Sequence, residues 1–167
     1  MNELLLQGLS ELGLDTSRVE TLERFSSLLL EKNEVMNLTA ITEPEAVAQL
    51  HLLDSAALTR FVDLSGKTVV DVGTGAGFPG MPLLILRPDL QITFLDALNK
   101  RILFLEDALK RLGLTAATLH ARAEDAAKMA AHREQYDAAV SRAVANAATL
   151  EELTLPFVKK GGCLLYT

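Results

Sequence analysis

Four glycines follow an acidic residue between positions 71 and 80, and this segment has the clearest potential for chemistry in the chain. Residues 69–72 are apolar except for Asp71, and the glycines that follow are Gly73, Gly75, Gly77 and Gly80. A short apolar strand that ends in glycines and continues into an apolar helix is typical of the edge at which a doubly wound sheet binds a ligand. Glycine is needed there because a tight turn uses positive φ and because a Cβ would keep the backbone away from the ligand.

The glycine spacing fits two kinds of cofactor. Gly75, Gly77 and Gly80 match the G-x-G-x-x-G pattern of dinucleotide-binding folds, and Asp96 follows Gly75 by 21 residues, near the usual place of a ribose-binding acid. The second frame is an acid-x-G-x-G-x-G motif made by Asp71, Gly73, Gly75 and Gly77. It resembles motif I of S-adenosylmethionine-dependent methyltransferases with a Rossmann-like fold. A carboxylate suits a cofactor that carries an ammonium group, whereas a phosphate requires a positive local field. We favour the second frame over a nicotinamide-dependent oxidoreductase and over a Rossmann-like domain without activity.

Further candidate site residues follow the next predicted strands. Asp96 ends a strand and could accept two hydrogen bonds from ribose hydroxyls, although an acid there can also cap the next helix. The backbone near Ala123 and Glu124 could hold an adenine edge; an acidic first turn of a helix is the alternative. Arg142 should face the same sheet edge, where burial requires an anionic partner, or else it forms a surface salt bridge.

A histidine in the N-terminal part of the chain has polar neighbours at helical spacing. His51, Asp54 and Ser55 are three and four residues apart, so they share one face of a predicted helix. They form either a polar patch over the ligand site or a junction at which the histidine packs between two parts of the protein. The sequence leaves both interpretations open.

The hydrophobic pattern changes near residue 66. The preceding residues predict helices only, one up to Gly13, a longer one after Asp15 or Thr16, and a third from Thr42. Afterwards strands and helices alternate: strands are expected over 68–72, 91–96, 116–120, 137–141 and 162–167, and helices near 79–87, 98–112, 124–131 and 146–157. We therefore expect an α/β fold with a mainly parallel sheet covered by helices on both faces, residues 66–167, preceded by a helical region, residues 1–65.

Composition narrows the class of protein. Cys163 is the only cysteine, which excludes an internal disulfide and a cysteine-rich zinc site. No apolar run approaches the ~20 residues that cross a bilayer, and the N-terminus lacks the basic start of a secretory signal. Residues 1–66 carry 4 Lys or Arg against 11 Asp or Glu, while residues 67–167 carry 12 against 11. We expect a cytoplasmic protein without a membrane partner, and the second part could present a basic surface to RNA.

These pieces, in this order, resemble the RsmG methyltransferases, also called glucose-inhibited division protein B (GidB). The matching segments are Lys32-Asn-Glu-Val-Met-Asn-Leu-Thr39, His51-Leu-Leu-Asp-Ser55, Asp71-Val-Gly-Thr-Gly-Ala-Gly-Phe-Pro-Gly-Met-Pro82, Leu95-Asp96, Lys100-Arg101, Arg122-Ala-Glu124 and Ser141-Arg142-Ala143. The resemblance implies a Rossmann-like class I methyltransferase that moves a methyl group from S-adenosyl-L-methionine to N7 of one guanine in the decoding-region loop of 16S ribosomal RNA. It also implies 16S RNA or the small ribosomal subunit as partner, and we expect a monomer.

The resemblance assigns site residues to this chain. The cofactor-binding residues that it implies are Gly73, Gly75, Gly77, Phe78, Asp96, Ala123, Glu124 and Arg142. Guanine N7 carries no proton, so we assign no catalytic base. We also expect no metal ligand. The chain stops inside the fifth predicted strand, and the C-terminal hairpin that is usual in the family is expected to be missing. An alternative expectation is therefore a cofactor-binding protein with weak or no activity that interacts with RNA or the ribosome.

Overall fold

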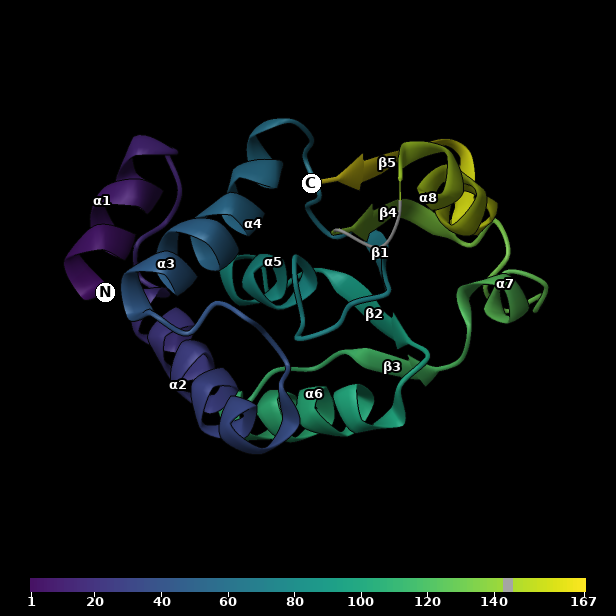
Figure 1. The fold of residues 1–167 in the computed structure, drawn as a ribbon. Helices are drawn as coiled ribbons and strands as arrows, with labels where there is room; N and C mark the ends of the chain where they lie inside the picture. The colour runs from purple at the N-terminus through teal and green to yellow at the C-terminus, as the bar shows by residue number, and fades with distance from the viewer. Residues whose placement is uncertain (143–145) are drawn as a thin grey trace.

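The computed structural model describes residues 1–142 and 146–167, and it contains one sheet between two layers of helices (Figure 1). The strands are β1 (Thr68–Val72), β2 (Gln91–Asp96), β3 (Ala117–His120), β4 (Tyr136–Ser141) and β5 (Val158–Tyr166). They lie in the order β3-β2-β1-β4-β5, and every pairing is parallel. The predicted α/β fold with a mainly parallel sheet is confirmed. Ala143, which closes the quoted segment at residues 141–143, lies outside the described residues.

The central strands are apolar because both of their faces are covered. In β1 the residues from Val69 to Val72 are all buried, and β4 is buried at every position except Asp137, which is partly exposed. A parallel strand between two helical layers needs such a continuous apolar run rather than an alternating pattern. This is why the predicted bounds of β1 and β2 agree with the structure residue for residue.

Strand β5 begins four residues before the predicted start at residue 162. Gly161 and Gly162, at the predicted start, lie inside the strand, where the pairing with β4 shifts register between Tyr136 and Ala138. Gly161 has φ +79, and a Cβ on Gly162 would lie 2.5 Å from the carbonyl oxygen of Asp137. The two glycines therefore allow an irregularity within the strand, and the predicted boundary is wrong.

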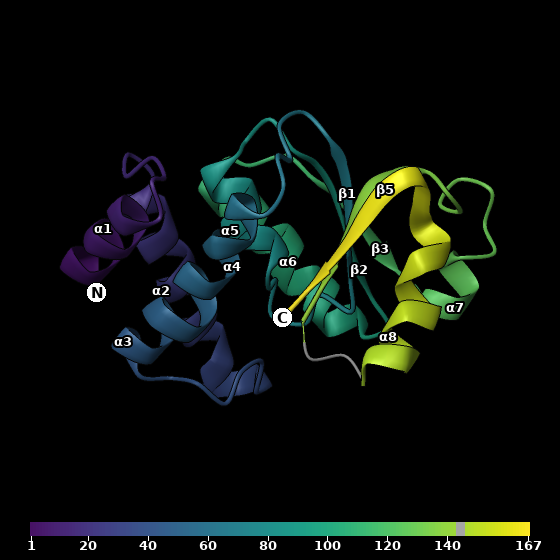
Figure 2. The ribbon, with the colours of Figure 1, turned by 90° about the horizontal axis from the view of Figure 1, so that it is seen from above.

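Helices α5 (Gly80–Leu86) and α6 (Asn99–Leu112) cover one face of the sheet, and α7 (Ala123–Ala126) and α8 (Ala147–Thr154) cover the other (Figure 2). Helix α6 ends because Gly113 adopts φ +67, and the N–H of Leu114 then bonds to the carbonyl oxygen of Leu109. Helix α7 is shorter than the predicted 124–131, since turns follow Ala126. The predicted helix 146–157 is α8 followed by a 3-10 turn, η3 (Leu155–Phe157), that contains Pro156.

The N-terminal region is helical, as expected. It consists of α1 (Asn2–Glu11), α2 (Val19–Met36), α3 (Pro44–Val47), the π-helical η1 (Ala48–Leu53), α4 (Asp54–Ala57) and the 3-10 turn η2 (Leu58–Arg60). The last four follow one another without a break, so the third predicted helix exists but contains a π-helical middle. Segments of this kind are rare in proteins and frequent at functional sites. Here the segment carries His51.

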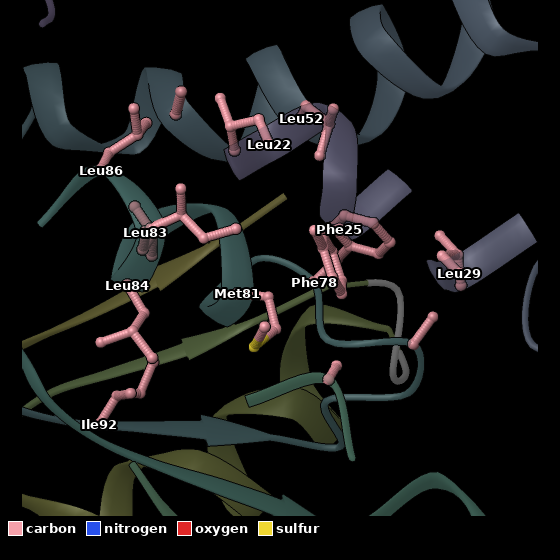
Figure 3. Close-up of a cluster of buried hydrophobic side chains, with 14 of the residues drawn as sticks. Leu22, Phe25, Leu29, Leu52, Phe78, Met81, Leu83, Leu84, Leu86 and Ile92 are labelled. Atoms are coloured by element: carbon pink, nitrogen blue, oxygen red, sulfur yellow. The ribbon is translucent and has the colours of Figure 1, made fainter. Parts of the chain in front are cut away.

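One hydrophobic core joins the N-terminal helices to the sheet. Buried side chains of α1, α2 and η1 belong to the same cluster as Val69, Ile92 and Phe104. Figure 3 shows Phe25 of α2 beside Phe78, and their ring centroids are 5.6 Å apart. A smaller cluster lies on the opposite face, under α7 and η3. The boundary between residues 65 and 66 stays a prediction. Among the described helices, none is both long enough and apolar enough to cross a bilayer.

Candidate functional site

A cavity of about 500 Å³ lies at the carboxyl ends of the strands. It is lined by the loop after β1, the end of β2, the loop after β3 and Arg142 after β4, together with a wall from the helical region. Its volume is in the usual range for a small-molecule site. Of the eight predicted cofactor-binding residues, it brings together Gly73, Gly75, Phe78, Asp96, Ala123, Glu124 and Arg142. Gly77 is not part of the lining.

The glycines of the loop after β1 serve two different purposes. Gly73 and Gly75 line the cavity with φ +65 and +59, a conformation that favours glycine. A Cβ on Gly75 would meet no atom within 4 Å, so the space beside it belongs to the cavity. A Cβ on Gly77 would instead lie 2.7 Å from Met81 Cγ and 2.8 Å from Leu105 Cδ2. Gly77 therefore allows α5 and α6 to pack closely against the loop.

Asp71 stabilises the glycine loop after β1 from the protein interior and does not line the cavity. Its carboxylate is fully buried, and Oδ2 accepts hydrogen bonds from Thr74 Oγ1 at 2.8 Å and from the backbone N–H of Gly80 at 2.9 Å. Oδ1 has no partner among the described residues. Burial raises the pKa of this carboxyl to about 7. The motif predicts an acid that suits a cofactor ammonium group, whereas in the structure Asp71 holds the glycine loop through these two hydrogen bonds.

Asp96 joins two loops of the cavity. Its side chain is 3 % exposed; Oδ2 accepts from the N–H of Gly75 at 2.9 Å and Oδ1 accepts from the N–H of Leu98 at 2.9 Å. Arg101 Nη1 lies 3.5 Å from Oδ2. The bond to Leu98 is a local turn, because aspartate often binds the backbone two residues ahead. It is not the helix cap considered as an alternative, since the N-cap residue of α6 is Leu98 and no side chain caps it. An ionised carboxylate has about four acceptor positions, so Asp96 can still accept from hydroxyl groups in the cavity.

The loop after β3 completes the far side of the cavity. The N–H of Ala121 donates to the carbonyl oxygen of Asp96 at 3.1 Å, which fixes the loop against β2. Ala123 and Glu124 start α7 and line the cavity. The carboxylate of Glu124 is exposed and lies 3.3 Å from Arg122 Nη1. Its backbone, and not this solvent-exposed ion pair, is therefore the part suited to hold a flat ligand edge.

Arg142 is held by groups of the helical region. Its side chain is 14 % exposed, its guanidinium forms an ion pair with Asp54, and Nη1 lies 3.0 Å from Nδ1 of His51. The anionic partner that burial of an arginine requires is thus Asp54. Ser55, the third residue of the predicted polar face, is fully buried, and its hydroxyl donates to the carbonyl oxygen of His51. His51 lines the cavity and Asp54 contacts it through Arg142, whereas Ser55 does neither.

Several lining residues were not identified as site residues from the sequence, and two of them follow the long helix α2. Leu38 and Thr39 line the cavity, although the sequence analysis assigned no role to them beyond the resemblance. Asn37 follows the last residue of α2 and adopts φ +50, and Asn33 Oδ1 then accepts from the N–H of Thr39 at 2.8 Å. An asparagine after a long helix is the available signal, because it tolerates the left-handed conformation and redirects the chain.

The sequence has close relatives of known family. Residues 18–167 match the model of the GidB family, described as rRNA small subunit methyltransferase G. The chain is 50 % identical to the ribosomal RNA small subunit methyltransferase G of Lachnoclostridium phytofermentans over 165 residues, which is 96 % of this chain and 68 % of that protein. The protein of the same name from Alkaliphilus metalliredigens is 49 % identical, with 95 % of this chain and 68 % of that protein covered.

Solved structures agree on the fold. A candidate S-adenosylmethionine-dependent methyltransferase from Methanococcus maripaludis superposes with a TM-score of 0.60 at 16 % identity, covering 84 % of this chain and 61 % of that one. A candidate methyltransferase from Bacillus halodurans gives a TM-score of 0.55 at 22 % identity, covering 67 % and 49 %. The expectation of a Rossmann-like class I methyltransferase fold is confirmed.

Proposed function

Since the chain belongs to the GidB family of rRNA small subunit methyltransferases, we propose that it transfers a methyl group from S-adenosylmethionine to N7 of a guanine in the decoding-region loop of 16S ribosomal RNA. The observation that carries the proposal is the cavity in which Gly75, Asp96 and Arg142 meet. In this proposal the acceptor is 16S RNA or the small ribosomal subunit, and the enzyme acts as a monomer in the cytoplasm.

The cofactor is S-adenosylmethionine, in agreement with the family and the fold. The cavity suits it because the space beside Gly75 is open and because the buried carboxylate of Asp96 keeps acceptor capacity. We assign the adenine to the backbone near Ala123 and Glu124, the ribose hydroxyls to Asp96, and the methionine part to Gly73 and Gly75. This assignment follows the strand order β3, β2, β1 along the cavity.

Catalysis in this proposal depends on alignment. When bound, S-adenosylmethionine supplies an electrophilic methyl group on a sulfonium. Guanine N7 carries no proton, so no side chain has to remove one, and the residues of the site orient the two reactants and exclude water. N7 lies on the major-groove edge, which side chains cannot reach in a regular A-form helix. The target base must therefore be in a loop or turned out of the stack.

A methyl-transfer assay tests the proposal. Labelled S-adenosylmethionine is incubated with the protein and with 16S RNA, or small subunits, that lack the modification, and the labelled base is identified after digestion. We expect one methyl group per RNA on N7 of a single guanine. Cofactor binding without transfer to either acceptor would identify the protein as a silent cofactor-binding partner of RNA. Binding of NAD(H) in place of S-adenosylmethionine would overturn both.

Asp96→Asn is expected to remove the discrimination between S-adenosylmethionine and an analogue without ribose hydroxyls. Hydrogen bonds to a charged group contribute about 1.5–3 kcal/mol, so calorimetry should show a loss of that size for S-adenosylmethionine and a much smaller loss for the analogue. Because Asp96 also accepts from the N–H groups of Gly75 and Leu98, some loss common to both ligands is expected. Equal losses for the two ligands would mean that Asp96 acts only through the loops.

Lys100, Arg101 and Arg142 are three cations near the cavity, and they are expected to affect RNA binding differently. Lys100 is exposed, Arg101 lies 3.5 Å from Asp96, and Arg142 is largely buried against Asp54. Lys100→Ala should reduce the slope of log K against log salt by about 0.7, the value for one contact to single-stranded RNA. Arg142→Ala should keep the slope and lower the methylation rate at saturating RNA.

A cation at the other end of α6 provides the control. Lys110 is exposed and lies in the last turn of that helix, so Lys110→Ala removes the same charge far from the cavity. For Lys110→Ala the slope of log K against log salt should equal that of the unmodified protein. If the slope for Lys100→Ala were also unchanged, the RNA would bind to another surface.

A further inference from the structure

His51 is packed flat against a ring of the glycine loop. It lies in the π-helical segment η1, is half-buried and lines the cavity. Its imidazole stacks on the phenyl ring of Phe78, with ring centroids 4.4 Å apart and planes 16° from parallel. Phe78 itself is 5 % exposed and touches Phe25 of the core on another side. The stack therefore connects the helical region to the loop that follows β1.

Both ring nitrogens of His51 have assigned partners, and these partners define its protonation state. Nδ1 lies 3.0 Å from Arg142 Nη1, and Nε2 lies 2.9 Å from Thr39 Oγ1. An arginine can only donate, so Nδ1 must be the acceptor and carry no proton. Nε2–H then donates to Thr39 Oγ1, whose other lone pair accepts from the N–H of Ile41 at 3.1 Å. The contacts require a neutral imidazole in one tautomer.

Arg142 is oriented by the same cluster. Its Nε donates to Thr167 Oγ1 at 3.1 Å, Nη1 donates to His51, and Nη2 pairs with Asp54. Its guanidinium carbon lies 5.7 Å from the centre of the Phe78 ring. Phe78 and Arg142 both line the cavity, and His51 is the residue that contacts both. A substitution of His51 should therefore alter the positions of both Phe78 and Arg142.

The position of this cluster along the strand order gives it a role. If the adenine lies at the loop after β3 and the ribose at Asp96, the reacting end of the cofactor lies toward β1 and β4, where Phe78, Arg142 and His51 are. We propose that His51 is a positioning residue for methyl transfer: as a neutral imidazole it fixes the Phe78 ring and the Arg142 guanidinium beside the reacting methyl group. This inference rests on the proposed function.

The charge balance supports a neutral His51. The ionisable groups that act on it are Arg142, at the end of β4, and Asp54, on the next turn of its own helix. Burial, and then the positive charge of Arg142, lower the pKa of His51 below its ordinary value. Acidification through that pKa would place two cations together and break the bond from Arg142. The arrangement is therefore complete at neutral pH and is lost as the pH falls.

The first test is the state of the ring itself, and it needs no activity. Nitrogen-15 NMR of the imidazoles in the full chain should show His51 as the Nε2–H tautomer at pH 7, with a pKa below 6.5. In Thr39→Val the Nε2 partner is removed, and the imidazole signals of His51 should shift while those of His132 stay unchanged. A His51 that is charged at pH 7, or that carries its proton on Nδ1, would overturn the inference.

The second test separates positioning from folding. His51→Phe keeps an aromatic ring for the stack on Phe78 but cannot accept from Arg142, so the kcat for methyl transfer should fall roughly 10- to 100-fold, the size of a small misplacement. The Kd for S-adenosylmethionine and the melting temperature should change little. His51→Asn offers an amide oxygen to Arg142, so its kcat should lie between those of His51→Phe and the unmodified chain. Because asparagine does not titrate, its kcat should not decline at acidic pH as that of the unmodified chain does.

Asp71 also titrates near the cavity, and the charge of Arg142 acts on it as well. The pH profile of kcat for each variant is therefore compared with that of the unmodified chain. His132→Asn is the matched control, because His132 bonds to Tyr136 and does not line the cavity. Unchanged kcat in His51→Phe, or a loss that follows the melting temperature in all variants, would refute positioning. Absence of transfer by the unmodified chain would refute the proposed function and leave the NMR result to decide the state of His51.

Discussion

Gly75→Val is expected to abolish S-adenosylmethionine binding in a protein that remains folded. Gly75 has φ +59, and its Cβ would point into the open space of the cavity, where the cofactor is assigned. A branched side chain both fills that space and resists the left-handed conformation, at a cost of about 1–2 kcal/mol. The turn that presents the N–H of Gly75 to Asp96 should therefore distort as well. Calorimetry measures the affinity, and circular dichroism measures the fold.

Gly113 provides a matched control for this substitution. It has φ +67, and a Cβ there would also meet no atom within 4 Å, but it ends α6 outside the cavity lining. Gly113→Val should therefore cause similar backbone strain and keep the affinity for S-adenosylmethionine. If Gly75→Val bound the cofactor as tightly as Gly113→Val does, the assignment of the methionine part to this loop would be wrong.

Asp71→Ala is expected to be among the most destabilising single changes in the chain. It removes the acceptor of two buried donors, the hydroxyl of Thr74 and the N–H of Gly80. Each buried donor without a partner costs about 1–3 kcal/mol. Asp71→Asn keeps one acceptor oxygen at nearly the same volume and should be milder. The free energy of unfolding in urea gives both values, and equal stabilities for the two variants would mean that the loop does not depend on these bonds.

The same residue makes a specific contribution to the pH dependence of stability. Burial raises the pKa of Asp71 to about 7, above its value in the unfolded chain. Between these two values the folded state holds a proton that the unfolded state has released. The stability from this group is thus present at acidic pH and is lost as the pH rises through about 7, with a slope of about 1.4 kcal/mol per pH unit.

The difference in the free energy of unfolding between the unmodified chain and Asp71→Asn isolates this contribution. This difference should change with pH between about pH 4 and 7 and level off on either side. Asp137 is the contrasting case: bonds from Thr68 lower its pKa, so its contribution is lost as the pH falls. Asp137→Asn should therefore change the pH dependence in the opposite direction. A pH-independent difference for Asp71→Asn would mean that its carboxyl is ionised at all these pH values.

Much of the sheet could be predicted because its central strands are mostly apolar and buried. Strands β1 and β2 lie between two helical layers, and the burial of most of their residues leaves a run of apolar side chains in the sequence. The ligand edge was predictable for a related reason, since Gly73 and Gly75 need positive φ that other residues resist. The start of β5 could not be predicted, because a pair of glycines such as Gly161 and Gly162 is equally typical of a turn and of an irregular strand.

The roles of individual site residues depended on three-dimensional contacts that spacing does not encode. The sequence places Asp71 and Gly77 in one motif with Gly75, but only Gly75 of these three lines the cavity. Whether a strand-end acid faces outward or into the loop is decided by donors such as the N–H of Gly80. The pairing of His51 with Arg142 joins residues 91 positions apart, and no local pattern indicates it.

The π-helical segment Ala48–Leu53 determines which way the side chains of the following helical residues, 54–60, face relative to those before it. An α-helix turns by about 100° per residue, so one extra residue in a wide turn rotates the downstream face relative to the upstream one. Val47 and Leu58 both face the core across this segment, while His51 between them faces the cavity. Removal of a single residue here would keep the helix and its composition, but it would rotate the two apolar faces out of alignment. The length of this turn, as much as the identity of its residues, is therefore under constraint.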